Sequence, residues 1–246
     1  MPMNIRRLLL IAALTLALPS TLFLRAEEGD TYDEGYEPNP PAPFPVEFKN
    51  FQILPESISP DAVCGLIYPK HSVLFDMKAT PLYLVQLNPF SVMKQLLPDA
   101  NLSGNHASYD VKWAENSSLV MITEGGKWGP HRVVIAQVLK GKAGKVTDLT
   151  AEIRKQLQPY YEKAKAKAGR YNDYFDYIFD SDSPEGWRIN NHGTQIDIWC
   201  TCTTDPKPPR GGAWVADFEG LWDISKNHFL QSKVTAQILP PDKDSD

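Results

Sequence analysis

The side chains best suited to binding a ligand lie in one short stretch, from Glu124 to Arg132. This stretch joins two apolar segments and carries Lys127, Trp128, His131 and Arg132. A loop that holds an indole ring beside several hydrogen-bond donors on a rigid hairpin is a common design for a binding loop. We therefore predict a binding site at these residues. The alternative is an ordinary hairpin loop, in which glycine supplies the positive φ of the turn.

Motifs of catalysis and metal binding are missing from the sequence. It contains no Gly-x-Ser-x-Gly, no His-Glu-x-x-His, no phosphate-binding glycine loop and no Cys-x-x-Cys. The segment Asp180 to Glu185 begins like a calcium loop, but proline occupies its fifth position and Asn191 its closing acid position. We therefore predict no metal and no other cofactor, and the sequence favours a protein that is not an enzyme. A hydrolase whose two carboxylates converge only in the folded chain stays open.

The cysteines are Cys64, Cys200 and Cys202. Cys200 and Cys202 fall on the same face of an alternating strand, where two thiols are poorly placed to bridge each other. We interpret them as small buried apolar residues, with a metal or redox pair as the alternative. A disulfide from Cys64 to one of the pair stays open.

The first residues have the layout of a secretory signal peptide. Arg6 and Arg7 precede an uncharged apolar run, and the small residue Ala26 stands at the expected cleavage position. We predict a signal peptide over residues 1–26 and export to the periplasm or the cell exterior, with an uncleaved N-terminal anchor as the alternative. Residues 27–45 are acidic and rich in proline, and residues 240–246 are similar, so we expect a disordered tether and a disordered tail.

Between residues 46 and 239, apolar and polar residues alternate in short segments, which is typical of β-strands with one buried face. We predict a single, mainly β domain of about three antiparallel four-stranded meanders. The first meander comprises Glu47 to Leu54, Ala62 to Tyr68, Pro81 to Leu87 and Ser91 to Leu97; the second comprises Tyr109 to Ala114, Ser118 to Glu124, Arg132 to Leu139 and Lys145 to Leu149; the third comprises Asp173 to Asp180 or Trp187 to Asn190, then Gln195 to Thr203, Ala213 to Asp223 and His228 to Ile238.

One amphipathic helix interrupts the strands, at residues 149–169. Its apolar residues recur at helical spacing, Thr147 or Asp148 can cap its start, and Gly169 can end it. Pro159 is expected to kink it. The other face is basic, and we interpret it as solvated, with a membrane-surface or partner helix as the alternative. The apolar stripe comprises Leu149, Ile153, Leu157, Tyr160, Tyr161, Ala164 and Ala168.

Aromatic residues elsewhere have two interpretations. Those between residues 171 and 179 either pack beneath the helix or form a platform on which a sugar stacks. We expect most other tryptophans to anchor the core, because most of them sit inside alternating strands. These are Trp113, Trp187, Trp199, Trp214 and Trp222.

A polar turn between two strands recurs in the chain. Ser59-Pro60-Asp61 and Val111 to Ser117, each followed by an apolar strand, resemble the inner-strand turn of exported bacterial β-propeller repeats of the WD-repeat or Tol-associated type, and Asn190 to Gly193 is a degenerate third copy. The resemblance implies four-stranded blades and binding of partners or ligands. A ring usually needs four or more blades of about 40–45 residues. We therefore expect an open stack of sheets, a twisted sandwich, or a ring completed by a second chain.

Composition narrows the function further. The formal charge of −5 and the scattered Lys and Arg residues give no basic surface for a nucleic acid. We predict an exported, non-enzymatic binding or scaffold protein with a protein or glycan partner, no integral membrane domain after signal cleavage, and oligomerisation open. The alternative is an exported hydrolase that acts on envelope or extracellular polymer.

Overall fold

The computed structural model describes residues 44–74, 77–100, 107–126, 129–168, 178–180, 186–204 and 213–239. The predicted signal peptide, nearly all of the tether, the tail and the loop after Asp180 lie outside these residues. So do Lys127, Trp128, Gly169 and the aromatic residues at 171–177. Within the described residues, no helix is long and apolar enough to span a membrane.

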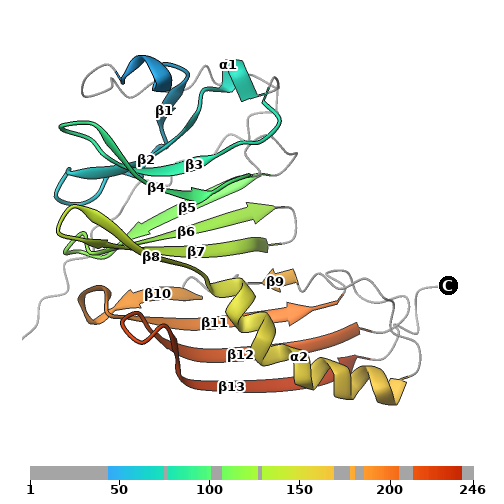
Figure 1. Cartoon of the computed structure of the whole chain (residues 1–246). Helices are drawn as coiled ribbons and strands as arrows, with labels where there is room; N and C mark the ends of the chain where they lie inside the picture. The colour runs from blue at the N-terminus through green and yellow to red at the C-terminus, as the bar shows by residue number, and fades with distance from the viewer. Residues whose placement is uncertain are drawn as a thin grey trace, which may run out of the picture. The chain divides into compact units, whose positions relative to one another are not determined.

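The predicted mainly β architecture is confirmed: the strands form separate antiparallel sheets that lie one after another (Figure 1). The first sheet contains β1 (Phe51–Ile53), β2 (Cys64–Pro69), β3 (Leu82–Gln86) and β4 (Ser91–Leu97); the second contains β5 (Ser108–Trp113), β6 (Leu119–Gly126), β7 (Gly129–Leu139) and β8 (Lys142–Asp148); the third contains β10 (Trp187–Asn190), β11 (Gln195–Thr203), β12 (Ala213–Asp223) and β13 (His228–Leu239) in that order, with β9 (Ile178–Asp180) also paired to β11.

Short helical turns occupy a few connections. Val46–Phe48 forms a 3-10 turn, so the predicted strand from Glu47 begins later, at Phe51. The short helix α1 spans His71–Leu74, and a second 3-10 turn covers Asn191–Gly193.

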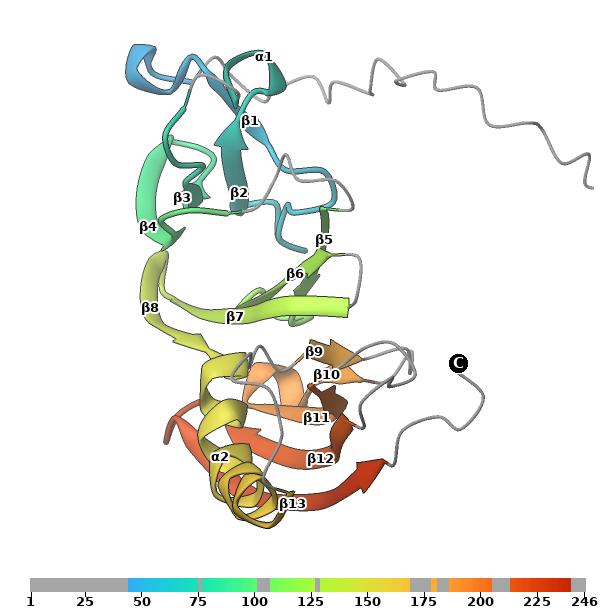
Figure 2. The same cartoon turned by 90° about the vertical axis from the view of Figure 1, so that its right-hand side faces the viewer.

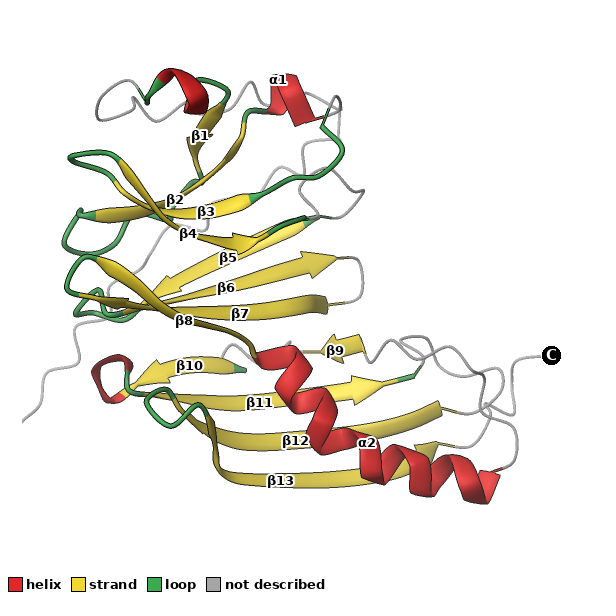
Figure 3. Cartoon of the chain, viewed as in Figure 1, coloured by secondary structure: helices red, strands yellow, loops and turns green. Residues whose placement is uncertain are grey.

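The inserted helix is confirmed as α2, Leu149–Ala168 (Figure 3). Asp148 caps its start, because the carboxylate accepts a hydrogen bond of 3.0 Å from the Ala151 N–H, which has no partner inside the helix. Pro159 lies inside the helix, where it removes one backbone donor. The helical spacing predicts Tyr160 on the apolar stripe, but this residue is exposed.

The second sheet is buried on both sides. Leu119 and Met121 of β6 belong to a core shared with the third sheet, whereas Val120 and Ile122 belong to a core shared with the first. Successive side chains of a strand point to opposite faces. The unbroken apolar run in β6 follows from burial on both faces.

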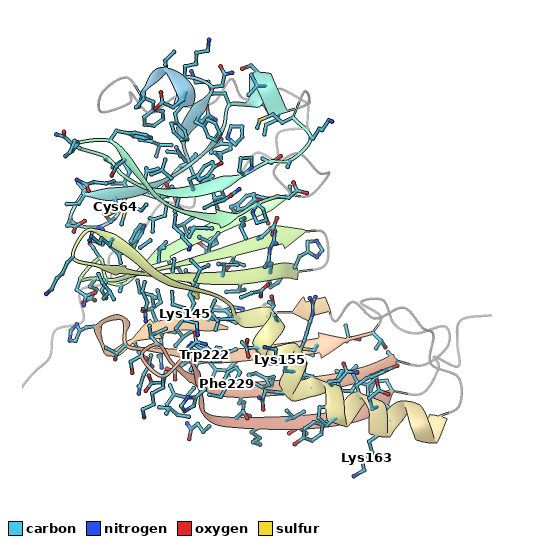
Figure 4. The ribbon with its side chains drawn as sticks, viewed as in Figure 1. Cys64, Lys145, Lys155, Lys163, Trp222 and Phe229 are labelled. Carbon is cyan, nitrogen blue, oxygen red and sulfur yellow. The ribbon has the colours of Figure 1, made fainter. Side chains whose placement is uncertain are left out.

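Among the described residues, the third sheet is covered on one face only. Helix α2 lies along that face (Figure 2), and its buried residues Ile153, Leu157 and Tyr161 join the same core as Trp214 and Trp222. Trp222 packs edge-to-face on Phe229 with ring centroids 4.8 Å apart, whereas Lys155 and Lys163 are exposed on the outer side of the helix (Figure 4).

The cysteines are buried free thiols. Cys64 contacts Met93 in the core between the first two sheets, while Cys200 and Cys202 lie 4.0 Å apart (Sγ to Sγ) in the core of the third. Burial raises the pKa of Cys64 and of Cys202 above the ordinary thiol value. The interpretation of Cys200 and Cys202 as small buried apolar residues therefore agrees with the structure, and no bridge joins Cys64 to the pair.

The recurring turns share one geometry. The Ser59 N–H donates to the Cys64 carbonyl at 2.9 Å, and the Ala114 N–H donates to the Leu119 carbonyl at the same distance. The third residue of each loop has positive φ: 57° at Ala62, 59° at Ser117 and 83° at Gly193. The third copy differs in that His192, before Gly193, also has positive φ.

These turns also contact one another. The Asp61 N–H donates to the Ser117 hydroxyl at 3.2 Å, and the Asn116 amide donates to the His192 carbonyl at 2.8 Å. The recurrent sequence therefore marks the places where neighbouring sheets are joined at one end.

Candidate functional site

The face of the third sheet turned away from α2, here called the outer face, is its polar side. On β11 the even-numbered residues from Ile196 to Cys202 are buried, and the odd-numbered ones are half-buried or exposed. Strand pairing adds Asp217 opposite Thr201 and Glu219 opposite Trp199. The outer face is therefore lined by hydrogen-bonding groups supported by a packed core beneath.

Trp199 stands in the middle of this face with 36% of its surface exposed. The prediction that it anchors the core is wrong, whereas Trp187, Trp214 and Trp222 are buried as predicted. Trp113 is half-buried, and its indole N–H donates to the Ser57 carbonyl, in the loop between β1 and β2, at 3.0 Å.

A charged network holds Arg188 against the exposed indole. The Arg188 guanidinium lies 5.8 Å from the Trp199 ring centroid and donates to the Asp197 carboxylate at 2.9 Å. The Asn190 amide donates to the same carboxylate oxygen. Asp197 therefore fixes Arg188 over the ring, so the exposed indole is bordered by polar groups.

Two further pairs extend the polar border. The Thr201 hydroxyl donates to the Asp217 carboxylate at 2.8 Å, and Lys233 of β13 donates to Glu219 at 3.0 Å. Exposed pairs of this kind add little stability. Their donors and acceptors are therefore groups that a ligand can engage at little cost to the fold.

His131 and Arg132 were predicted on a binding loop, but both lie inside strand β7, because the β6–β7 pairing continues to Gly126 and Gly129. His131 is exposed, and its ring lies so close to Gly126 that a Cβ there would stand 1.9 Å from Nε2. Arg132 instead pairs with the buried Glu124 carboxylate, with Nε 2.8 Å from Oε2, and donates to the Asp99 carbonyl at 2.9 Å. Arg132 thus ties the second sheet to the segment after β4, and binding by the loop stays a prediction.

The Tyr109 hydroxyl completes this cluster, 3.4 Å from Oε1 of Glu124. Burial, with the neighbouring Glu124 carboxylate, raises the pKa of Tyr109 far above its ordinary value, so the phenol stays protonated and donates. Arg132 and Tyr109 compensate the buried Glu124 carboxylate, as a buried charge requires. We therefore interpret this cluster as structural.

Two carboxylates in turns have lowered pKa values. The Ser59 hydroxyl lowers the pKa of Asp61, and the Ser225 hydroxyl lowers that of Asp223. A general acid at neutral pH needs a raised pKa instead.

Within the described residues, no group of three or more His, Cys, Asp or Glu side chains is placed to hold a metal ion.

Comparisons of the chain with models of protein families, with curated proteins and with solved structures found no match.

Proposed function

We propose that the chain is an exported, non-enzymatic binding or scaffold protein whose outer face binds a glycan. The observation that carries this proposal is Trp199, a large indole exposed on a rigid sheet and bordered by polar side chains. An exposed aromatic ring with convergent hydrogen-bonding groups is a common form of binding surface.

The chemistry of the border suits a sugar chain. A pyranose presents C–H groups on one face, which can lie on an indole, and hydroxyls at its edge, which need both donors and acceptors. Arg188 and Thr201 offer donors, while Asp197, Asp217 and Glu219 offer acceptors. An indole ring with such a polar border suits a sugar better than a purely apolar ligand.

The charge of the outer face favours a neutral ligand over a phosphate-rich one. Among the described residues of this face, the carboxylates of Asp197, Asp217 and Glu219 outnumber the cations of Arg188 and Lys233. A nucleic acid or an anionic membrane surface requires the opposite balance.

The support beneath the ring keeps it in place. Ile198 and Cys200, on either side of Trp199 in the chain, are buried, as is Phe218 on the adjacent strand β12. A preordered binding residue loses little conformational freedom when the ligand binds.

The N-terminal residues support export as part of the proposal, because Arg6 and Arg7, the apolar run and Ala26 form a signal-peptide pattern. Fusion of residues 1–45 to an alkaline phosphatase that is active only outside the cytoplasm tests this part. We expect phosphatase activity from the fusion, and loss of it when Arg6, Arg7 and the apolar run are deleted. An inactive but intact fusion would contradict export.

Co-sedimentation with insoluble polysaccharides tests the binding surface. The protein from residue 27 is mixed with peptidoglycan sacculi, cellulose, chitin and starch granules, and the bound fraction is measured against protein concentration. We expect retention on at least one of them, and about 10- to 30-fold weaker retention for Trp199→Ala, the usual loss for a central tryptophan.

The matched variants are Trp199→Phe and Tyr160→Ala. Phenylalanine keeps a stacking ring and should retain most of the binding. Tyr160 is an aromatic residue on α2, away from the outer face, that is even more exposed than Trp199, and its removal should leave the retention unchanged. No retention on any polysaccharide, or equal losses for Trp199→Ala and Tyr160→Ala, would reject the glycan-binding proposal.

A further inference from the structure

Strand β13 forms an edge of the third sheet. It pairs with β12 along one side, and no described strand pairs with its other side, as Figures 1 and 2 show. None of its twelve residues is buried. In an antiparallel strand with one neighbour, every second residue directs its backbone N–H and C=O outward, which makes a long edge a template for another strand.

The sequence of β13 is nearly palindromic about Val234. Leu230 matches Ile238 across this centre, and Gln231 matches Gln237. Ser232 likewise matches Ala236. Two identical strands that pair antiparallel with Val234 opposite Val234 therefore place similar residues opposite each other.

This register joins the exposed apolar residues of β13. Leu230 and Ile238 are 41% and 40% exposed. Val234 and Ile238 lie on the face that carries the core, whereas Leu230 is the extra residue of a bulge between the pairs Leu221–Gln231 and Trp222–Phe229. In the paired strands, each Leu230 comes beside an Ile238 of the other copy, so apolar surface is removed from water.

The charges select the same register. With a two-fold axis normal to the sheet, the core faces of both copies lie on the same side of the joined sheet. Residues opposite each other must then belong to the same face, so the pairing is centred on one residue that faces its own copy. Centring on Lys233 would set Lys233 against Lys233, whereas centring on Thr235 would set Ile238 against Ser232. Centring on Val234 avoids both mismatches, because Lys233 then faces Thr235.

We propose that two copies of this chain associate through antiparallel pairing of β13 around Val234, which joins their third sheets into one continuous sheet. Because the two-fold axis is normal to this sheet, both outer faces point the same way. The dimer does not depend on the proposed ligand. If Trp199 binds a glycan, however, the dimer offers two sites to one polymer, which raises its avidity.

Sedimentation-velocity measurements on the protein from residue 27 test this inference. We expect a monomer–dimer equilibrium. Thr235→Glu sets a carboxylate opposite Lys233 at two symmetric places and should tighten the dimer about tenfold, while Thr235→Lys should weaken it by a similar factor. Thr235 is exposed, so neither change disturbs the core.

Cysteine cross-linking fixes the register. Val234→Cys places two thiols directly opposite and should give a disulfide-linked dimer under mild oxidation, whereas Gln237→Cys places them many residues apart and should not. The three native thiols are buried and should not interfere. Trp199→Ala should leave the dimer unchanged, which separates this inference from ligand binding.

A wild-type protein that stays monomeric at its highest soluble concentration would overturn the proposal. So would a dimer that responds equally to Thr235→Glu and Thr235→Lys, because it would use another surface. If Val234→Cys does not fold, the opposite shifts of the two Thr235 variants still decide the question.

Discussion

Gly193 offers the sharpest test of how the second and third sheets are joined. Its φ is 83°, and a Cβ at this position would stand 2.7 Å from the Ala114 Cβ and 2.8 Å from the Ser118 hydroxyl oxygen. Both contacts belong to the recurring turn of the second sheet. Gly193→Ala therefore combines a strained backbone with a steric overlap between neighbouring turns.

The two effects can be estimated separately. A left-handed backbone costs an L-residue about 1–2 kcal/mol. Overpacking a close contact costs about 1–3 kcal/mol more. The control is Gly141→Ala in the β7–β8 turn, where φ is 72° but nothing lies within 4 Å of the added Cβ. This control carries only the backbone cost, so the two variants should differ by about 1–3 kcal/mol.

Urea unfolding of the protein from residue 27, followed by tryptophan fluorescence, measures both free energies of unfolding. In thermal unfolding, the same difference corresponds to a melting temperature about 3–10 °C lower for Gly193→Ala than for Gly141→Ala. Adding Ala114→Gly removes one of the two overlaps and should recover about 1 kcal/mol. Equal destabilisation by Gly193→Ala and Gly141→Ala would refute the contact between the turns.

Further predictions concern charge and thiol chemistry. Because the pKa of Asp61 is lowered, the folded state binds this proton more weakly than the unfolded chain does, so the stabilisation is present above about pH 4 and is lost as the pH falls. Asp61→Asn should therefore weaken the pH dependence of the free energy of unfolding across this range. An unchanged pH dependence would contradict this prediction. Arg132→Ala leaves the Glu124 carboxylate buried without its cation and should lower the free energy of unfolding by about 2 kcal/mol; a change within error would exclude a structural role. Cys64 and Cys202 should react with iodoacetamide far more slowly in the folded protein than in urea, as followed by mass spectrometry, and equal rates would show them to be accessible.

Much of the architecture could be predicted because the local patterns are strong. The period-two alternation from Gln195 to Thr203 and the helical stripe from Leu149 each fix an element without knowledge of its neighbours. The limits of the first strand were harder to predict, because Val46–Phe48 is apolar but turns as a 3-10 helix. Short apolar segments do not reveal their backbone conformation.

The outer face could have been found from the same alternation. Trp199 shares its parity in β11 with Asp197 and Thr201, which marks it as outward-facing, but the prediction of a core anchor rested only on its place inside an alternating strand and not on its parity. The role of Arg132 was not predictable, because its partner Glu124 lies across a hairpin whose register the sequence does not specify. The exposed edge of β13 was not predictable either, because it depends on the order of the strands in the third sheet.

Hydroxyl-radical footprinting with and without a retained polysaccharide tests glycan binding at the outer face most directly. Oxidation of each exposed aromatic residue is measured by mass spectrometry at saturating polysaccharide. The proposal predicts that Trp199 is strongly protected while Tyr160 on α2 is oxidised equally in both samples. Unchanged oxidation of Trp199 together with protection of Trp128 or His131 would contradict it and assign binding to the β6–β7 hairpin.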